Sequence, residues 1–219
     1  MFRSNSSRHP PEVYHSQDFT ESCGTILVDK VTRTICLLEE RSTRFLVLPK
    51  GRRDTFESRQ AAALRETREE SGYACRLAAI ELPTRTTAPG GNPDAPDRSR
   101  VVRGTGEPFT MLAIPRPAGR VKLVWYFLAE TTREYDGRGL DGKAYFGPCQ
   151  EVGEGERRYE AKWYDWREAE QVVTSEEDAE VVKRAGELME QSWGWGVDEG
   201  EVEMVEWAGE DTMGGPGRG

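Results

Sequence analysis

Three glutamates on one predicted helix constrain this chain of 219 residues more than any other feature of its sequence. The stretch 57–71 is rich in Ala, Leu, Arg and Glu, which favour a helix. On that helix Glu66, Glu69 and Glu70 share one face, because residues three and four positions apart are neighbours. Like charges at this spacing repel one another, so we expect a cation over this face.

The residues around the three glutamates fit this interpretation. Leu64 and Thr67 point away from the carboxylates and are expected to dock the helix on a sheet. Gly51 begins the preceding loop, where a backbone carbonyl can approach an ion, and Gly72 suits a left-handed helix end. Carboxylate oxygens at this density favour Mg²⁺ or Mn²⁺ over zinc or copper. The sequence therefore predicts a divalent-metal site.

The remaining chain alternates short strands with helices, which indicates one α/β body between residues 22 and 191. Strands are expected at 23–29, 34–39, 45–48, 73–82, 121–130 and 159–165. Further helices are expected at 166–172 and 176–191, the second with Ser175 as its N-cap.

Three segments differ from this body in composition. Residues 83–120 hold seven of the twelve prolines and six arginines against three acids, so we expect an irregular basic excursion inside a body that spans 21–191. Residues 1–20 are expected to form a flexible arm. Residues 192–219 form an acidic tail with Gly and Trp, which leaves open a contact with the body or with a partner protein.

Composition narrows the classes of function. A net charge of −9 argues against a general nucleic-acid binder, and no apolar run is long enough to span a bilayer. The four cysteines (Cys23, Cys36, Cys75 and Cys149) lack metal-ligand spacing, which predicts reduced thiols. Reduced thiols indicate a cytoplasmic protein, and a nuclear location is also open. Only two histidines occur, so catalysis is expected to depend on carboxylates, Lys or Arg.

Residues 51–73, read as G-x5-E-x7-R-E-U-x-E-E-x-G-U, resemble the Nudix box of the Nudix hydrolases. The matching fixed positions are Gly51, Glu57, Arg65, Glu66, Glu69, Glu70 and Gly72. Thr67 and Tyr73 stand at two positions of the box that are usually aliphatic, and both positions serve packing and not chemistry. The order of strand, loop and helix also resembles the family, which implies an α+β fold with a mixed sheet sandwiched between helices.

The resemblance implies hydrolysis of a diphosphate bond with Mg²⁺ or Mn²⁺ as cofactor. By position, Glu66, Glu69 and Glu70 would hold the metal with the Gly51 carbonyl, and one of them or a later glutamate would deprotonate water. Glu57 and Arg65 would pair and support the box, closed by Gly72. Candidates for the later acid are Glu156, Glu160 and Glu130.

The substrate is the least constrained part of the prediction. Residues 48–51 (LPKG) and 63–67 (ALRET) resemble both asymmetrical diadenosine tetraphosphate hydrolases and diphosphoinositol polyphosphate phosphohydrolases, while 22–28 and 122–130 favour the dinucleotide branch. Candidate substrate-binding residues are Lys50, Arg52, Arg53, Arg85, Lys122 and Tyr159. The competing class is a non-catalytic binding or scaffold module, and messenger-RNA decapping ranks lower because no basic RNA-binding surface is evident.

Overall fold

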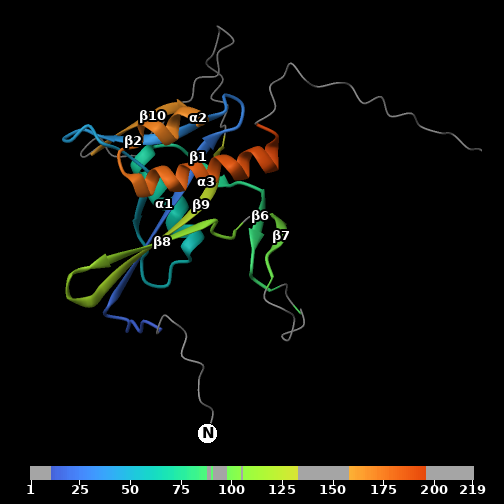
Figure 1. Ribbon diagram of the computed structural model, residues 1–219. Coiled ribbons are helices and arrows are strands. Elements are labelled where there is room, and N and C mark those ends of the chain that lie inside the picture. The colour runs from blue at the N-terminus through green and yellow to red at the C-terminus, as the bar shows by residue number, and fades with distance from the viewer. Residues whose placement is uncertain (1–10, 88–89, 91–97, 105, 133–157, 196–219) are drawn as a thin grey trace, which may run out of the picture.

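The computed structural model describes residues 11–87, 90, 98–104, 106–132 and 158–195 (Figure 1). Its strands are β1 Phe19–Asp29, β2 Thr34–Glu40, β3 Leu46–Val47, β4 Lys50–Arg52, β5 Cys75–Leu77, β6 Ile80–Thr84, β7 Arg100–Gly104, β8 Thr110–Arg116, β9 Arg120–Thr131 and β10 Tyr159–Asp165. Its helices are α1 Arg59–Ser71, α2 Trp166–Val172 and α3 Glu176–Trp193, with a 3₁₀ turn η1 at Pro117–Gly119.

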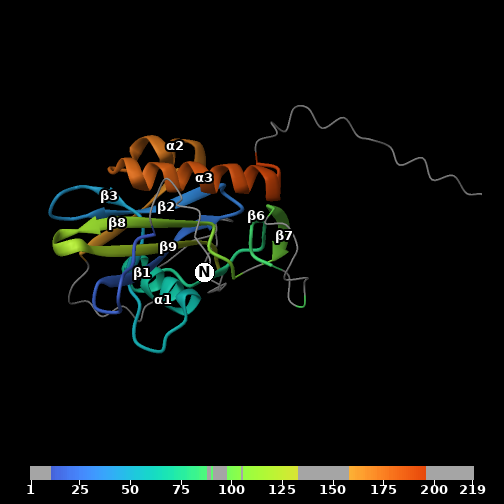
Figure 2. The ribbon, with the colours of Figure 1, turned by 60° about the horizontal axis from the view of Figure 1, so that its bottom comes forward.

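Eight of the described strands form one mixed sheet. Its order is β10-β2-β1-β9-β5, with β3 beside β2, β4 beside β1 and β8 beside β9. β1 and β9 run parallel, whereas the other strand pairs of this sheet run antiparallel. β6 and β7 form a separate two-stranded sheet. Figure 2 shows α1 on one side of the large sheet and α2 and α3 on the other, which confirms the expected sandwich.

Alternation along the central strands β1 and β9 separates two cores, because successive side chains of a strand point to opposite faces. The side chains that pack with α2 and α3 include Ile26, Val28, Val124, Tyr126 and Leu128. Those that pack with α1 or on its side include Cys23, Leu27, Phe127 and Ala129. Each position on these strands can therefore be assigned to the α3 face or the α1 face.

Two sequence-based expectations about strands are wrong. The predicted strand at 73–82 is divided into β5 and β6, because the chain changes its partner from β9 to β7. The segment 83–120 is not irregular throughout, since it contains β7 and β8. Its prolines lie where strands tolerate them: Pro83 in the two-stranded sheet, Pro115 on the edge strand β8, and Pro117 at the start of η1.

Local signals place the helix ends. The side chain of Ser58 accepts a hydrogen bond from Ala61 N–H at the start of α1, and Gly72 ends this helix with φ 80°. Ser175 caps α3 in the same way, as expected. Among the described residues, no helix combines the length and apolar character needed to cross a membrane.

The structure describes only part of the predicted arm, the predicted tail and the cysteines. The expected arm at 1–20 overlaps the start of β1, and its first ten residues lie outside the described part, as do 196–219 of the expected tail. Cys23, Cys36 and Cys75 are free thiols, and Cys149 lies outside the described residues.

Candidate active site

The inner face of α1 is made of small side chains, which brings the helix close to β1. Ala62, Ala63 and Thr67 are fully buried, and the Thr67 hydroxyl lies 2.9 Å from the Thr25 hydroxyl of β1. The Thr67 hydroxyl also donates to the Ala63 carbonyl. A threonine at this usually aliphatic position therefore packs and satisfies its own polar group, and the helix presents its glutamates beside β4.

Arg65 fixes the loop before α1 to the helix. Its Nε and Nη2 donate to both carboxylate oxygens of Glu57, at 2.9 and 3.0 Å. Its Nη2 also donates to the Arg52 carbonyl at 3.0 Å. The hydrogen bonds from Arg65 lower the pKa of Glu57 to about 2, so this pair stays charged across the physiological range. The structure thus contains the predicted Glu57–Arg65 pair.

Glu66 and Glu70 both reach the backbone of β4. A Cβ at Gly51 would overlap the Glu66 carboxylate, so the glycine leaves the space that this carboxylate fills. One oxygen of Glu70 accepts a hydrogen bond from Lys50 N–H at 2.9 Å. Two carboxylates from successive turns of α1 therefore lie at consecutive backbone positions of β4.

The burial of these two carboxylates disfavours their charge. Burial raises the pKa of Glu70 to about 7, although the Lys50 N–H group acts to lower it, and the Glu66 charge raises it further. Burial also raises the pKa of Glu66, against the opposing effect of Arg65, whose Nη1 lies 2.8 Å from Glu66 Oε1. A cation placed between them would remove this penalty.

Glu69 is oriented differently from its two neighbours. Its side chain is 58% exposed and accepts a hydrogen bond from Arg65 Nη1 at 3.2 Å. Within the part of the chain that the structure describes, no three His, Cys, Asp or Glu side chains are grouped as a metal site. The three carboxylates are therefore not gathered in this arrangement, although Arg65 Nη1 contacts both Glu66 and Glu69, and the prediction that all three hold a metal stays a prediction.

The donor groups present nevertheless fit a hard divalent cation. Glu66 and Glu70 offer carboxylate oxygens that are partly desolvated, and the glycine at position 51 leaves backbone and carboxylate in close approach. Oxygen donors of this kind suit Mg²⁺ or Mn²⁺. Glu69 could join them by giving up its hydrogen bond to Arg65.

The predicted substrate-binding residues fall into two groups. Lys50, Arg52 and Lys122 share the α3 face of the sheet, opposite to the face that α1 covers, and of these described residues only Lys50 contacts a carboxylate of α1, through its backbone N–H. Arg53 instead donates to Glu21 and to the Glu57 carbonyl, at 2.9 and 2.8 Å, so it holds the loop before α1. The remaining two candidates are Arg85, which is exposed just after β6, and Tyr159.

Tyr159 lies on β10, on the α1 side of the sheet, where it packs with the core cluster beneath that helix. Its neighbour Arg158 stacks on the Tyr159 ring at 5.3 Å. Burial raises the pKa of Tyr159, and the charge of Glu70 raises it further, which places this phenol within electrostatic reach of the candidate site.

The described candidates for a later acid lie in ion pairs away from α1 and stay predictions. Glu160 alternates with Tyr159 on β10 and therefore faces away from α1, where it pairs with Lys162. Glu130 pairs with Lys30 at 2.6 Å and Arg76 at 2.8 Å. Glu156 lies outside the described residues.

Two acidic residues that support the site were missed by sequence reasoning. Glu21 accepts hydrogen bonds from Arg53, Arg59 and the Trp125 ring nitrogen. Asp178, at the start of α3, is 5% exposed and accepts a hydrogen bond from the Tyr126 hydroxyl at 3.2 Å. Its other oxygen lies 3.7 Å from Lys50 Nζ. Both act in the site through contacts between distant segments, and the local pattern that includes Asp178, three residues after the Ser175 N-cap, indicates only the start of a helix.

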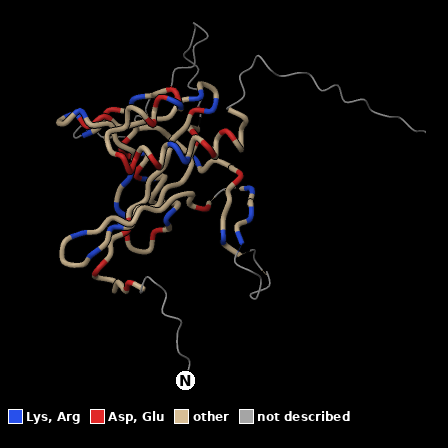
Figure 3. Tube along the Cα trace, viewed as in Figure 1, with Lys and Arg blue, Asp and Glu red and all other residues tan. Residues whose placement is uncertain are grey.

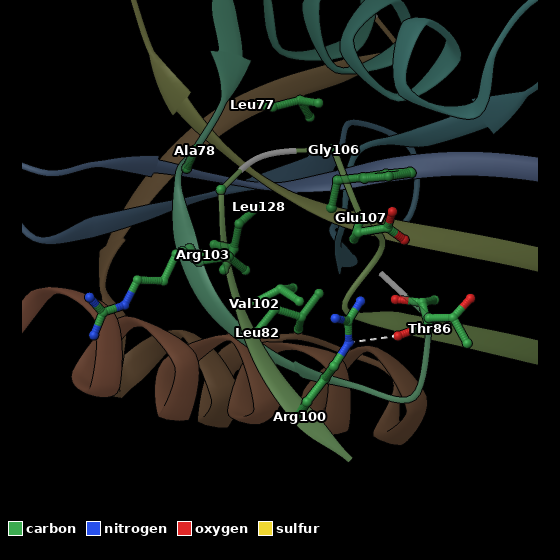
Figure 4. Close-up of a pocket in the computed structure, with 14 residues that line it drawn as sticks. Leu77, Ala78, Leu82, Thr86, Arg100, Val102, Arg103, Gly106, Glu107 and Leu128 are labelled. Carbon is green, nitrogen blue, oxygen red and sulfur yellow. Dashed lines mark hydrogen bonds between the residues drawn. The ribbon is translucent and has the colours of Figure 1, made fainter. Parts of the chain in front are cut away.

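A pocket of about 470 Å³ lies away from these carboxylates, between the β6–β7 hairpin and β9 (Figure 4). Its lining includes Leu82, Val102 and Leu128, and Arg100 at its rim donates to the Thr86 carbonyl at 2.8 Å. None of the glutamates of α1 contributes to it. We therefore assign the chemistry to the α1–β4 junction and not to this pocket.

No protein-family model and no curated protein matches the chain. Solved structures do resemble it, among them the Ap4A hydrolase of C. elegans, at 16% identity over 77% of this chain and 97% of that one, with a TM-score of 0.46. A Nudix hydrolase from Nitrosomonas europaea is 14% identical over 77% and 90%, with a TM-score of 0.43. A MutT Nudix hydrolase from Burkholderia pseudomallei is 18% identical over 76% and 97%, also at 0.43.

Proposed function

We propose that this chain hydrolyses a diphosphate bond in a dinucleoside polyphosphate such as diadenosine tetraphosphate, with Mg²⁺ or Mn²⁺ as cofactor. One observation carries the proposal: Glu66 and Glu70 of α1 both lie against the backbone of β4, at Gly51 and Lys50. The Glu57–Arg65 pair fixes the helix and the loop in that arrangement. These are the residues that match the Nudix box.

Each residue then has a defined task. Glu66 and Glu70, together with the Gly51 carbonyl and a reoriented Glu69, would hold the metal, which when bound polarises the phosphoryl group and acidifies its bound water. Glu70, whose pKa is about 7 in the metal-free protein, would lose its proton when it binds the metal. Lys50 would bind a phosphate oxygen.

Contacts at the start of β1 favour the dinucleotide branch over diphosphoinositol polyphosphates. The inositol branch usually carries basic residues just before its first strand, where the sequence suggested Glu21 and Ser22; both lie within β1, and the residue directly before β1 is the acidic Asp18. Glu21 pairs with both Arg53 and Arg59, so its negative charge offsets one of the two positive charges near this edge. A highly charged inositol ligand would therefore find less positive charge at that position.

Product analysis tests this proposal. The protein is incubated with Mg²⁺ and diadenosine tetraphosphate or, separately, a diphosphoinositol polyphosphate, in water labelled with oxygen-18. We expect ATP and AMP from the dinucleotide, with the label in one product, and a lower kcat/KM for the inositol compound. Faster loss of phosphate from the inositol compound would favour the other branch. No product from either substrate would favour the binding-module alternative.

A further inference from the structure

Cationic side chains from three strands lie on the α3 face of the sheet, and four of them are considered together, apart from Arg120, which donates to the Pro117 carbonyl. Lys122 shares its face of β9 with Val124 and Tyr126, which pack beneath α3. The other members are Lys50, Arg52 and Arg116, and we call the four residues the basic strip. Cross-strand partners lie on the same face, and Lys50 is opposite Gly24, Arg52 opposite Ser22, and Arg116 opposite Arg120.

The basic strip has little negative charge to balance it. Throughout the described part of the chain, Arg52, Arg116 and Lys122 form no ion pair. Lys50 lies near Asp178, but this carboxylate is buried and also accepts a hydrogen bond from the Tyr126 hydroxyl. Figure 3 shows the Lys and Arg positions along the β8–β9 hairpin that supplies half of the strip.

Lys122 distinguishes the strip from an ordinary solvated surface. Its side chain is half-buried, and burial lowers the pKa of its ammonium group, as do the charges of Lys50, Arg116 and Arg52. A half-buried cation without a partner is unfavourable, and a bound anion would relieve both the desolvation and the repulsion. The charges of Lys50, Arg52 and Arg116 all act on Lys122, so an anion bound at Lys122 would be attracted by the other three groups as well.

The strip begins at the candidate active site and extends away from it. The backbone of Lys50 binds Glu70, while its side chain belongs to the strip. Gly24 aligns Lys50 with Tyr126 across the sheet, and Lys122 is four residues before Tyr126 on β9. At about 3.3 Å per residue this is about 13 Å along the strand, which exceeds one diphosphate group.

We propose that the basic strip binds the phosphates of the substrate that lie beyond the cleaved bond, so that the protein selects polyphosphates by chain length. This proposal rests on the proposed function and deepens it. Lys50 and Arg52 lie at the near end, whereas Arg116 and Lys122 lie at the far end and would contact only a long chain. Guanidinium and ammonium groups are suited to this, because they bind phosphate through charge-assisted hydrogen bonds.

Calorimetric titration of the full chain, in EDTA, tests the strip without turnover. The probes are inorganic pyrophosphate, tripolyphosphate and tetrapolyphosphate. We expect affinity to rise with length, and Arg116→Gln and Lys122→Gln to weaken tetrapolyphosphate roughly tenfold while changing pyrophosphate less than about twofold. Arg103→Gln on β7, which pairs with Glu81, is the matched control and should change neither. Equal binding of all three probes, or no effect of either strip variant, would overturn the proposal.

A hydrolysis assay distinguishes a failure of the basic-strip proposal from a failure of the proposed function. The same variants are assayed with diadenosine tri-, tetra- and pentaphosphate and Mg²⁺. We expect the far-end variants to lose kcat/KM mainly with the longer substrates. If the dinucleotides are cleaved but the variants match the wild type at every length, the strip is wrong and the proposed function stands. If length-dependent binding occurs without cleavage of any dinucleotide, the proposed function is wrong and the strip stands.

Discussion

At the scale of single residues, Glu70 is a proposed metal ligand whose burial disfavours its charged form in the folded protein. Its carboxylate is half-buried, and in the metal-free protein burial raises its pKa to about 7, far above that of a solvated glutamate. Ionisable residues whose pKa is shifted this strongly by burial are frequent at functional sites. The neighbouring Glu57 shows the opposite: its pKa is lowered to about 2 by Arg65, as expected of a structural pair.

This raised pKa predicts how stability depends on pH. Because the folded pKa lies above the unfolded value, the contribution of Glu70 is favourable below about pH 4.5 and is lost as pH rises through about 7. In EDTA, Glu70→Gln should therefore stabilise the fold at pH 8 by roughly 1–3 kcal/mol and change it little near pH 5. Urea unfolding at both pH values measures this. An equal change at the two values would contradict the assigned burial.

Metal binding should carry the same signature. A ligand carboxylate must lose its proton, so the affinity for Mn²⁺ should fall up to about tenfold per pH unit below pH 7. Above about pH 8 the affinity should level off. Electron paramagnetic resonance titration of free Mn²⁺ between pH 5.5 and 8.5 checks this. A flat profile would exclude Glu70 as a ligand.

At the scale of elements, local signals were enough for the helices. Ser58, Gly72 and Ser175 act through their own neighbours in sequence, so the ends of α1 and α3 follow from short patterns. Strands depend on distant partners. β8 pairs with β9 and β7 pairs with β6. Neither pairing was predicted, because the prolines of this segment indicated an irregular structure. Local composition reports propensity, whereas edge strands tolerate proline.

Two glycines at the α1–β4 junction give a matched test of this element. The three atoms nearest to a Cβ at Gly51 belong to the Glu66 carboxylate, whereas a Cβ at Gly24 would overlap the Pro49 carbonyl and Lys50. Gly51→Ala should lower kcat at least about tenfold with little loss of stability, because a side chain can rotate away. Gly24→Ala should cost about 1–3 kcal/mol of unfolding free energy, because backbone must move. Activity assays and urea unfolding of both variants test this. A larger loss of stability in Gly51→Ala than in Gly24→Ala would contradict the described packing.

At the scale of the whole molecule, the sequence indicated the sandwich and the α1–β4 carboxylates but not which cations converge. Arg53 and Lys122 looked equivalent in sequence, yet Glu21 binds Arg53 and no carboxylate in the described residues pairs with Lys122. Competition between partners from distant segments decides these outcomes, and it is not encoded in spacing.

The most direct test of the central claim is turnover by Glu70→Gln and Glu160→Gln with diadenosine tetraphosphate and Mg²⁺. Glu70 lies at the α1–β4 junction, whereas Glu160 faces away from it beside Lys162, so it is a control of matched chemistry. With circular dichroism showing both variants folded, we predict that Glu70→Gln lowers kcat by at least about 10²-fold and Glu160→Gln by less than about twofold. Near wild-type turnover by Glu70→Gln would contradict the account.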